Sequence, residues 1–211
     1  MRAAMSLPSP QLLLEHFGVF VSAITGVLAA RGKKIDLFGV LVLALVTAFG
    51  GGTVRDVLVG DLPVVWLRGP GLLINATVAA LLTFFAARFY KLPHRALVVA
   101  DALALAFFTM LGTQKGVALH FSPPVAVLLG VVTGVAGGIA RDVLTGEMPM
   151  VFRPEIRLYA TASLCGAVAS VALHGLGVGG SLVTLAGAGL VLALRLAAIY
   201  WKLSLPVFEA R

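Results

Sequence analysis

The stretch GGTVRDVLVGDLP, residues 51–63, returns as GGIARDVLTGEMP, residues 137–149, after a shift of 86 residues. Eight of the 13 positions are identical, among them both glycines of the leading pair, the arginine, the aspartate and the proline. Arginine, aspartate and proline are uncommon in a chain whose commonest residues are leucine, alanine, valine and glycine. The match therefore indicates an internal duplication, and it raises the question of why so apolar a chain keeps both copies.

The composition places the chain in a lipid bilayer. Hydrophobic residues make up 60% of its 211 residues, charged residues only 12%, and the mean hydropathy is +1.04, which a soluble domain of this length does not reach. Four runs without a charged residue, each 18 to 20 residues long, occupy 37–54, 69–87, 121–140 and 175–194, and about 20 helical residues cross the hydrocarbon core. Three further spans are expected at about 12–30, 96–113 and 157–173. We therefore predict an all-α membrane protein with seven transmembrane helices.

Each copy of the duplicated block belongs to a unit of three predicted helices. Because three is odd, the second unit enters the membrane from the opposite face, so the two repeats are inverted and related by a pseudo-twofold axis in the membrane plane. The same shift places Glu15 on Asp101 and Thr47 on Thr133. The predicted organisation is one membrane domain over 1–211, with repeats at about 11–90 and 96–176 and a seventh helix at about 179–201.

Lysine and arginine are divided unevenly between the two sets of loops. The richer set holds Arg31, Lys33, Lys34, Arg88, Lys91, Arg95, Arg153, Arg157, Lys202 and Arg211, and the poorer set holds Arg2, Arg68 and Lys115. By the positive-inside rule the richer set is cytoplasmic. We therefore predict a multi-pass protein of the inner (cell) membrane with its N-terminus outside and its C-terminus in the cytoplasm. The net charge of +7 does not favour nucleic acid, because the basic residues fall between apolar segments and form no aromatic-lined basic face.

The glycines of the duplicated block lie near the ends of the second and fifth predicted helices. They are Gly50, Gly51, Gly52, Gly137 and Gly138. Glycine costs roughly 1 kcal/mol relative to alanine inside a helix, so these runs favour a break in each helix. Paired breaks in inverted repeats are typical of a transport pathway, in which freed carbonyls line a wet cavity. The alternative is close packing of helices, which we favour for Gly130 and Gly134.

The charged pair after each glycine pair is costly in a membrane unless it faces the bundle interior, a partner or water. Adjacent residues on a helix do not face each other, so we expect a cross-repeat partner: Arg55 with Asp142, or Arg141 with Asp56, or carbonyls at the opposite break. The alternative is that both pairs are ordinary helix-end charges at the membrane interface. Thr53 and Thr133 add hydroxyls to the candidate pathway, although threonine in a membrane helix commonly bonds its own backbone.

Residues for covalent chemistry are not apparent in the sequence. It contains neither a nucleophile elbow nor a phosphate-binding loop nor a zinc-protease motif. The four histidines fall in separate segments and Cys165 is the only cysteine. We therefore predict no metal site, no cofactor and no enzymatic activity.

The twin blocks in a 3 + 3 + 1 arrangement resemble the prokaryotic trimeric intracellular cation (TRIC) channels, whose bacterial members are also described as a glycine-transporter domain family. The resemblance covers about residues 12–201. It implies a homotrimer in membrane lipid, each subunit having its own pore for monovalent cations, chiefly potassium, with sodium also a candidate. In that family the pore runs between helices kinked at the glycine motifs, here 50–52 and 137–138. The second copy departs from the first in having Ala136 where the first has Gly50.

The sequence is compatible with three functions. The leading hypothesis is a passive potassium-permeable channel built around the broken helices. The second is a secondary transporter of a small zwitterion such as glycine, because inverted repeats are common in alternating-access carriers and Arg55 or Arg141 would hold its carboxylate. The third is a structural scaffold in which the glycines serve packing alone.

Overall fold

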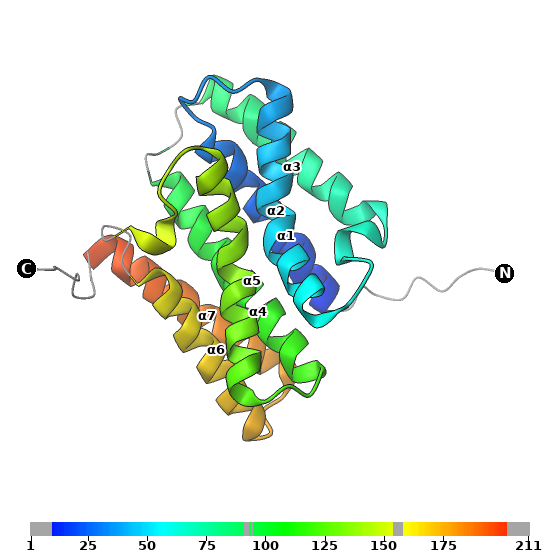
Figure 1. Cartoon of the computed structure of the whole chain (residues 1–211). Helices are drawn as coiled ribbons and strands as arrows, with labels where there is room; N and C mark the ends of the chain where they lie inside the picture. Colours follow the sequence, from blue (N-terminus) through cyan, green and yellow to red (C-terminus); the bar gives the residue numbers. More distant parts are fainter. Residues whose placement is uncertain (1–9, 91–92, 94, 154–157, 202–211) are drawn as a thin grey trace, which may run out of the picture.

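A computed structural model describes residues 10–90, 93, 95–153 and 158–201 of the chain. These residues form seven α-helices and two short 3-10 helices, without strands among them (Figure 1). The helices are α1 (Pro10–Ala29), α2 (Leu37–Val59), η1 (Val65–Leu67), α3 (Pro70–Phe89), α4 (Ala96–Ala118), α5 (Pro123–Leu144), η2 (Met150–Phe152), α6 (Tyr159–Gly175) and α7 (Gly180–Trp201). The predicted all-α fold with seven helices is confirmed. Five of the loop charges counted above, Arg2, Lys91, Arg157, Lys202 and Arg211, lie outside the described residues.

Six of the seven helices are long and apolar enough to cross a membrane. The exception is α6, whose 17 residues rise about 26 Å, slightly less than the ~30 Å thickness of the hydrocarbon core. Large apolar side chains such as Phe38, Leu82 and Leu185 remain exposed on the outside of the bundle. In water this surface would be unfavourable, whereas in a bilayer it faces lipid tails. The chain is thus a multi-pass membrane protein.

The helices form two triplets of matching arrangement. In the first, α1 contacts both α2 and α3; in the second, α4 contacts both α5 and α6. The triplets meet through α1 against α4 and α2 against α5, which cross in the middle of the bundle (Figure 1). The inverted repeat predicted from sequence is therefore present in space. The seventh helix breaks the symmetry, because α7 packs on α4 and α6 of the second triplet.

Equivalent glycines end the central helix of each triplet. Gly60, the C-cap of α2, has φ 71°, and Gly146, just beyond α5, has φ 70°. This left-handed conformation is the usual end of a helix and is nearly strain-free only for glycine. Local backbone geometry thus explains why both copies of the block have glycine at this position.

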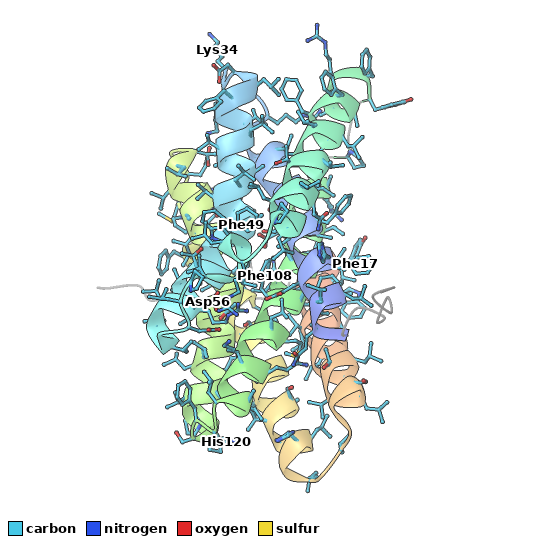
Figure 2. All side chains as sticks on the ribbon, turned by 90° about the vertical axis from the view of Figure 1, so that its right-hand side faces the viewer. Phe17, Lys34, Phe49, Asp56, Phe108 and His120 are labelled. Atoms are coloured by element: carbon cyan, nitrogen blue, oxygen red, sulfur yellow. The ribbon has the colours of Figure 1, made fainter. Side chains whose placement is uncertain are left out.

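Loop charges identify the two ends of the bundle. We call the end that carries Lys33 the Lys33 face and the opposite end, which carries Lys115, the Lys115 face. Figure 2 shows Lys34 at one end and His120 at the other, with Asp56 and Phe108 between them. Apolar clusters fill the interior on either side of the α1–α4 contact, one around Ala23 and Ala44, the other around Met110 and Val191.

Candidate functional site

The helices are continuous at the repeated glycines. Residues Leu37–Val59 form one uninterrupted α-helix through Gly50, Gly51 and Gly52, and Pro123–Leu144 does the same through Gly137 and Gly138. The prediction of glycine-broken helices with freed carbonyls is therefore wrong. Two or three adjacent glycines, at ~1 kcal/mol each, cost too little helical free energy to open a helix that tertiary contacts hold on both sides.

The glycines serve the crossing of α2 and α5. A β-carbon added at Gly51 would fall well inside 3.0 Å of the Thr133 carbonyl oxygen, and one added at Gly137 would lie 2.5 Å from the Thr47 carbonyl oxygen. The repeat exchanges these two contacts, since the shift places Gly51 on Gly137 and Thr47 on Thr133. Close packing, the alternative raised from the sequence, holds here because only glycine lets two backbones approach this closely.

The other glycines divide between packing and open space. A β-carbon at Gly50 would lie 3.3 Å from the Gly137 α-carbon, and one at Gly134 would lie 2.6 Å from the Thr109 hydroxyl of α4. The packing role expected for Gly130 and Gly134 is confirmed, since both lie against threonines of α4. Gly52 is different, because the nearest atoms to a β-carbon placed there, from the Arg55 and Val65 side chains, lie 3.9 Å away.

Each arginine of the block binds the aspartate that follows it. Arg55 Nε donates to Asp56 Oδ1 at 2.8 Å, and Arg141 Nε donates to Asp142 Oδ1 at 2.8 Å. The predicted cross-repeat pairs, Arg55 with Asp142 and Arg141 with Asp56, are therefore wrong. The alternative of interfacial helix-end charges is wrong too, because Arg55 is only 4% exposed and Arg141 is 0% exposed.

The loop beyond each helix holds the aspartate in place. The second carboxylate oxygen of Asp56 accepts the Val65 N–H at 2.9 Å, and that of Asp142 accepts the Met150 N–H at 2.7 Å. Both donors belong to the short 3-10 helix that follows the block. With one oxygen held by the loop, each aspartate has its other oxygen bound by the guanidinium of the arginine just before it. Adjacent residues do not face each other on a regular helix, so the spacing alone did not predict this contact.

A second carboxylate, from the first helix of each triplet, completes each cluster. Arg55 Nη2 lies 3.6 Å from Glu15 Oε1 of α1, and Arg141 Nη1 donates to Asp101 Oδ1 of α4 at 2.7 Å. We call Glu15, Arg55 and Asp56 the first triad and Asp101, Arg141 and Asp142 the second triad. Sequence reasoning did not place Glu15 and Asp101 in the site, although the 86-residue shift that pairs them was the available signal.

Hydroxyl groups lie between the two triads, at the α2–α5 crossing. A cavity of about 10 Å³ is lined by Ser22, Thr25, Thr47 and Thr133 together with Asp101 and Arg141. A second cavity of about 10 Å³ adjoins Glu15 and Arg55. Each has room for about one water molecule. We call the two triads with the hydroxyls between them the buried polar column, along which these two small cavities lie.

The threonine hydroxyls of the column also bond their own helices. Thr47 donates to the Leu43 carbonyl and Thr133 to the Leu129 carbonyl, each at 2.6 Å, the common behaviour of membrane threonines. Each hydroxyl oxygen keeps lone pairs for a water or a cation. Thr53 is elsewhere: its hydroxyl accepts the Trp66 indole N–H at 3.1 Å, away from the crossing.

Cross-repeat ion pairs do occur, at the two faces of the bundle. Lys33, after α1, binds Glu147 of the second repeat, and Lys115, at the end of α4, binds Asp61 of the first. The 86-residue shift places Asp61 on Glu147, so the two acids are equivalent, whereas their lysine partners occupy different positions of the repeat. On the Lys33 face a cavity of about 620 Å³, lined by Lys33 and Glu147 among others, reaches inward to Asp142.

The acidic members of these face pairs have lowered pKa values. Hydrogen bonds from Lys115 and Arg68 lower the pKa of Asp61, and a hydrogen bond from Lys33 lowers the pKa of Glu147. A folded-state pKa below the unfolded value of about 4 stabilises the fold above that value, and this stability is lost as the pH falls through the lowered pKa.

We therefore expect the Asp61→Asn, Glu147→Gln double variant to melt at a lower temperature than the wild type at neutral pH. The difference should stay constant between about pH 8 and pH 5 and shrink below about pH 4, where the wild-type carboxylates become protonated. Thermal unfolding in detergent across this pH range measures it. A difference that already disappears near pH 6 would contradict the assignment.

The chain is similar in sequence to known membrane proteins over most of its length. The family model described as Glycine transporter matches residues 12–88 and again residues 98–175. The chain is 44% identical over 197 residues to a UPF0126 inner membrane protein of Escherichia coli, covering 92% of this chain and 94% of the relative. A UPF0126 membrane protein of Vibrio cholerae is 43% identical, covering 93% of this chain and 82% of the relative.

Solved structures agree with the sequence relatives. The TRIC trimeric intracellular cation channel orthologue from Rhodobacter sphaeroides superposes with a TM-score of 0.87 at 36% identity, covering 93% of this chain and all of the other (100%). A second solved structure comes from work on conductance through TRIC cation channels. It superposes with a TM-score of 0.84 at 31% identity, covering 94% of this chain and 97% of the other. These relatives are channels and not enzymes. Inverted triplets, twin charge triads and both sets of comparisons together show that the chain belongs to the family of trimeric intracellular cation (TRIC) channels.

Proposed function

We propose that the protein is a passive channel for monovalent cations, chiefly potassium and also sodium, with one pore in each subunit of a homotrimer. The observation that carries this proposal is the buried polar column, in which carboxylates flank a layer of hydroxyls. Oxygen ligands of this kind replace the hydration shell of a cation at close quarters. Similarity to solved cation channels over most of the chain supports the same reading.

The pathway follows the α2–α5 crossing. A cation entering from either face meets a triad, Glu15 with Arg55 and Asp56 or Asp101 with Arg141 and Asp142, and between the triads it passes the hydroxyls. Gly51 and Gly137 set the separation of the two helices at the crossing. With only about 10 Å³ free at the centre, the described conformation is closed, and conduction requires the two helices to separate.

The expected location is the cell (inner) membrane. The relative from Escherichia coli is named an inner membrane protein, and the basic residues are concentrated on the Lys33 face. By the positive-inside rule this face is cytoplasmic and the N-terminus is outside. A homotrimer is proposed because the similar structure from Rhodobacter sphaeroides is named a trimeric channel.

Planar bilayers test the proposal directly. Purified protein should give unitary currents in potassium chloride, with a reversal potential under a salt gradient that follows the cation. Replacing potassium by sodium on one side should leave a current and shift its reversal potential. Slow solute exchange without unitary currents would overturn the channel assignment.

Transport of a small zwitterion such as glycine is the second candidate, favoured by the description of the matching family model. In the described structure the guanidinium groups of Arg55 and Arg141 already bind carboxylates of the protein. A bound glycine would have to displace one of them, at a desolvation cost. Saturable uptake of labelled glycine by proteoliposomes, abolished in Arg141→Ala while that variant still folds, would favour the transporter.

A further inference from the structure

The two triads differ because α7 contributes a charge to only one of them. Arg195, in the last third of α7, is 0% exposed. Its guanidinium carbon lies 4.7 Å from the centre of the Tyr159 ring, a cation–π contact, and it is close enough to Asp101 for the charges to attract each other. The 86-residue shift places Leu73 where the second repeat has Tyr159, and no helix of the described chain occupies the place of α7 beside the first triplet.

The result is an unequal charge at the two ends of the column. The first triad has two carboxylates and one guanidinium, which leaves one net negative charge. The second triad has the same composition, but Arg195 adds a further positive charge and makes the cluster neutral. The face ion pairs are alike in composition, since each combines one lysine, one acid and one arginine: Lys115, Asp61 and Arg68 on one face, Lys33, Glu147 and Arg153 on the other. Lys115 also attracts Glu15 of the first triad, but its ammonium group is already bound by Asp61.

The surroundings of the equivalent glycines Gly52 and Gly138 also differ between the two repeats. A β-carbon at Gly138 would lie 2.9 Å from the Tyr159 hydroxyl and 3.5 Å from Asp101 Oδ1, so the tyrosine fills the space beside the second triad. The equivalent position in the first repeat, Gly52, has nothing closer than 3.9 Å. The first triad is thus negative with open space at Gly52, and the second is neutral with Tyr159 in the corresponding space at Gly138, although a cavity of about 10 Å³ adjoins each triad.

We propose that Arg195 sets the rectification of the pore: held by Tyr159, it neutralises the second triad and makes the first triad the cation-concentrating end of the pore. The inference rests on the proposed channel function. A fixed negative charge at one end raises the local cation concentration there. Cations therefore enter faster from the Lys115 face, and the open pore passes unequal currents at equal voltages of opposite sign.

Single-channel recordings in symmetrical potassium chloride measure this inequality, since each inserted channel has one orientation. In Arg195→Met, an uncharged variant with a flexible apolar side chain, the smaller of the two currents should rise at least about twofold and the ratio should approach one. Arg195→Lys retains the charge and should keep the wild-type ratio. Arg88→Met, at the exposed end of α3, is the matched control and should change little, because exposed charges are screened within roughly 8 Å.

A second variant gives a distinguishable result should Arg195→Met not assemble. Glu15 has a side chain 17% exposed and tolerates replacement better than the fully buried arginine. Glu15→Gln removes the excess charge of the first triad, so the larger current should fall while the smaller one stays. Wild-type currents of equal size in both directions, or an unchanged ratio in folded Arg195→Met or Glu15→Gln, would overturn this inference. The absence of any wild-type current would instead overturn the proposed channel function.

Discussion

Replacement of Arg141 by methionine is expected to prevent the protein from accumulating as a stable folded species. The substitution leaves Asp101 and Asp142 facing each other inside the bundle without the guanidinium that binds both, at 2.7 and 2.8 Å. Removing one partner of a buried ion pair costs about 3–5 kcal/mol, a large part of the 5–15 kcal/mol by which a typical protein is stable. Monodispersity after extraction and the melting temperature in detergent measure the loss.

Arg55→Met is the matched control for that experiment. It removes the equivalent arginine from the first triad, where Glu15 lies farther away, at 3.6 Å, with a side chain 17% exposed. Because Glu15 has access to solvent, we expect roughly half the loss in melting temperature. The double variant Arg141→Met, Asp101→Asn should recover part of the loss by removing one uncompensated charge. Equal melting temperatures for Arg141→Met and the wild type would show that the second triad does not stabilise the fold.

Gly51→Ala is expected to be nearly as damaging, although it adds a single methyl group. The new β-carbon would overlap the Thr133 carbonyl oxygen across the α2–α5 crossing, and a backbone carbonyl inside a helix has no rotamer by which to move away. Overpacking of a core costs about 1–3 kcal/mol where side chains yield, so we expect at least the upper value here. Thermal unfolding in detergent and the unitary conductance of any folded protein are the measurements.

Gly52→Ala tests whether the glycines matter as a break or as a contact. Its β-carbon would meet nothing closer than 3.9 Å, and alanine favours a continuous helix over glycine by up to about 1 kcal/mol. We therefore expect a melting temperature equal to or above that of the wild type. If Gly52→Ala destabilised the protein as much as Gly51→Ala, helix flexibility and not close approach would be the common requirement.

Most of the fold that could be predicted from the sequence was predicted from its internal repeat. Helix number followed from charge-free runs of suitable length, and inversion followed from the odd number of helices in each repeat, because the membrane fixes both without reference to neighbours. The shift also identified Gly60 and Gly146 as equivalent, and each ends its helix in the left-handed conformation.

The sequence predicted most of the residues that form the site but not which of them contact each other. The block pointed to Gly51, Arg55, Asp56 and their copies, all of which lie at the crossing or in a triad. The partner of each arginine depended on where the following loop held the aspartate and on which helix face α1 and α4 presented. Those are distances between segments far apart in the chain, and local helix rules contain no information on them.

The sequence by itself determined that this chain spans a membrane as an inverted pair of three-helix units with charged residues inside them, because the cost of placing polar groups in lipid restricts apolar length and charge position directly. Only the tertiary structure decided that the glycines join two intact helices, that Glu15 and Asp101 complete the triads, and that Arg195 makes the two halves unequal. Glycine permits both a break and a close contact, and the choice between them is made by the backbone of the other helix at the crossing, as the overlap of a Gly51 β-carbon with Thr133 illustrates.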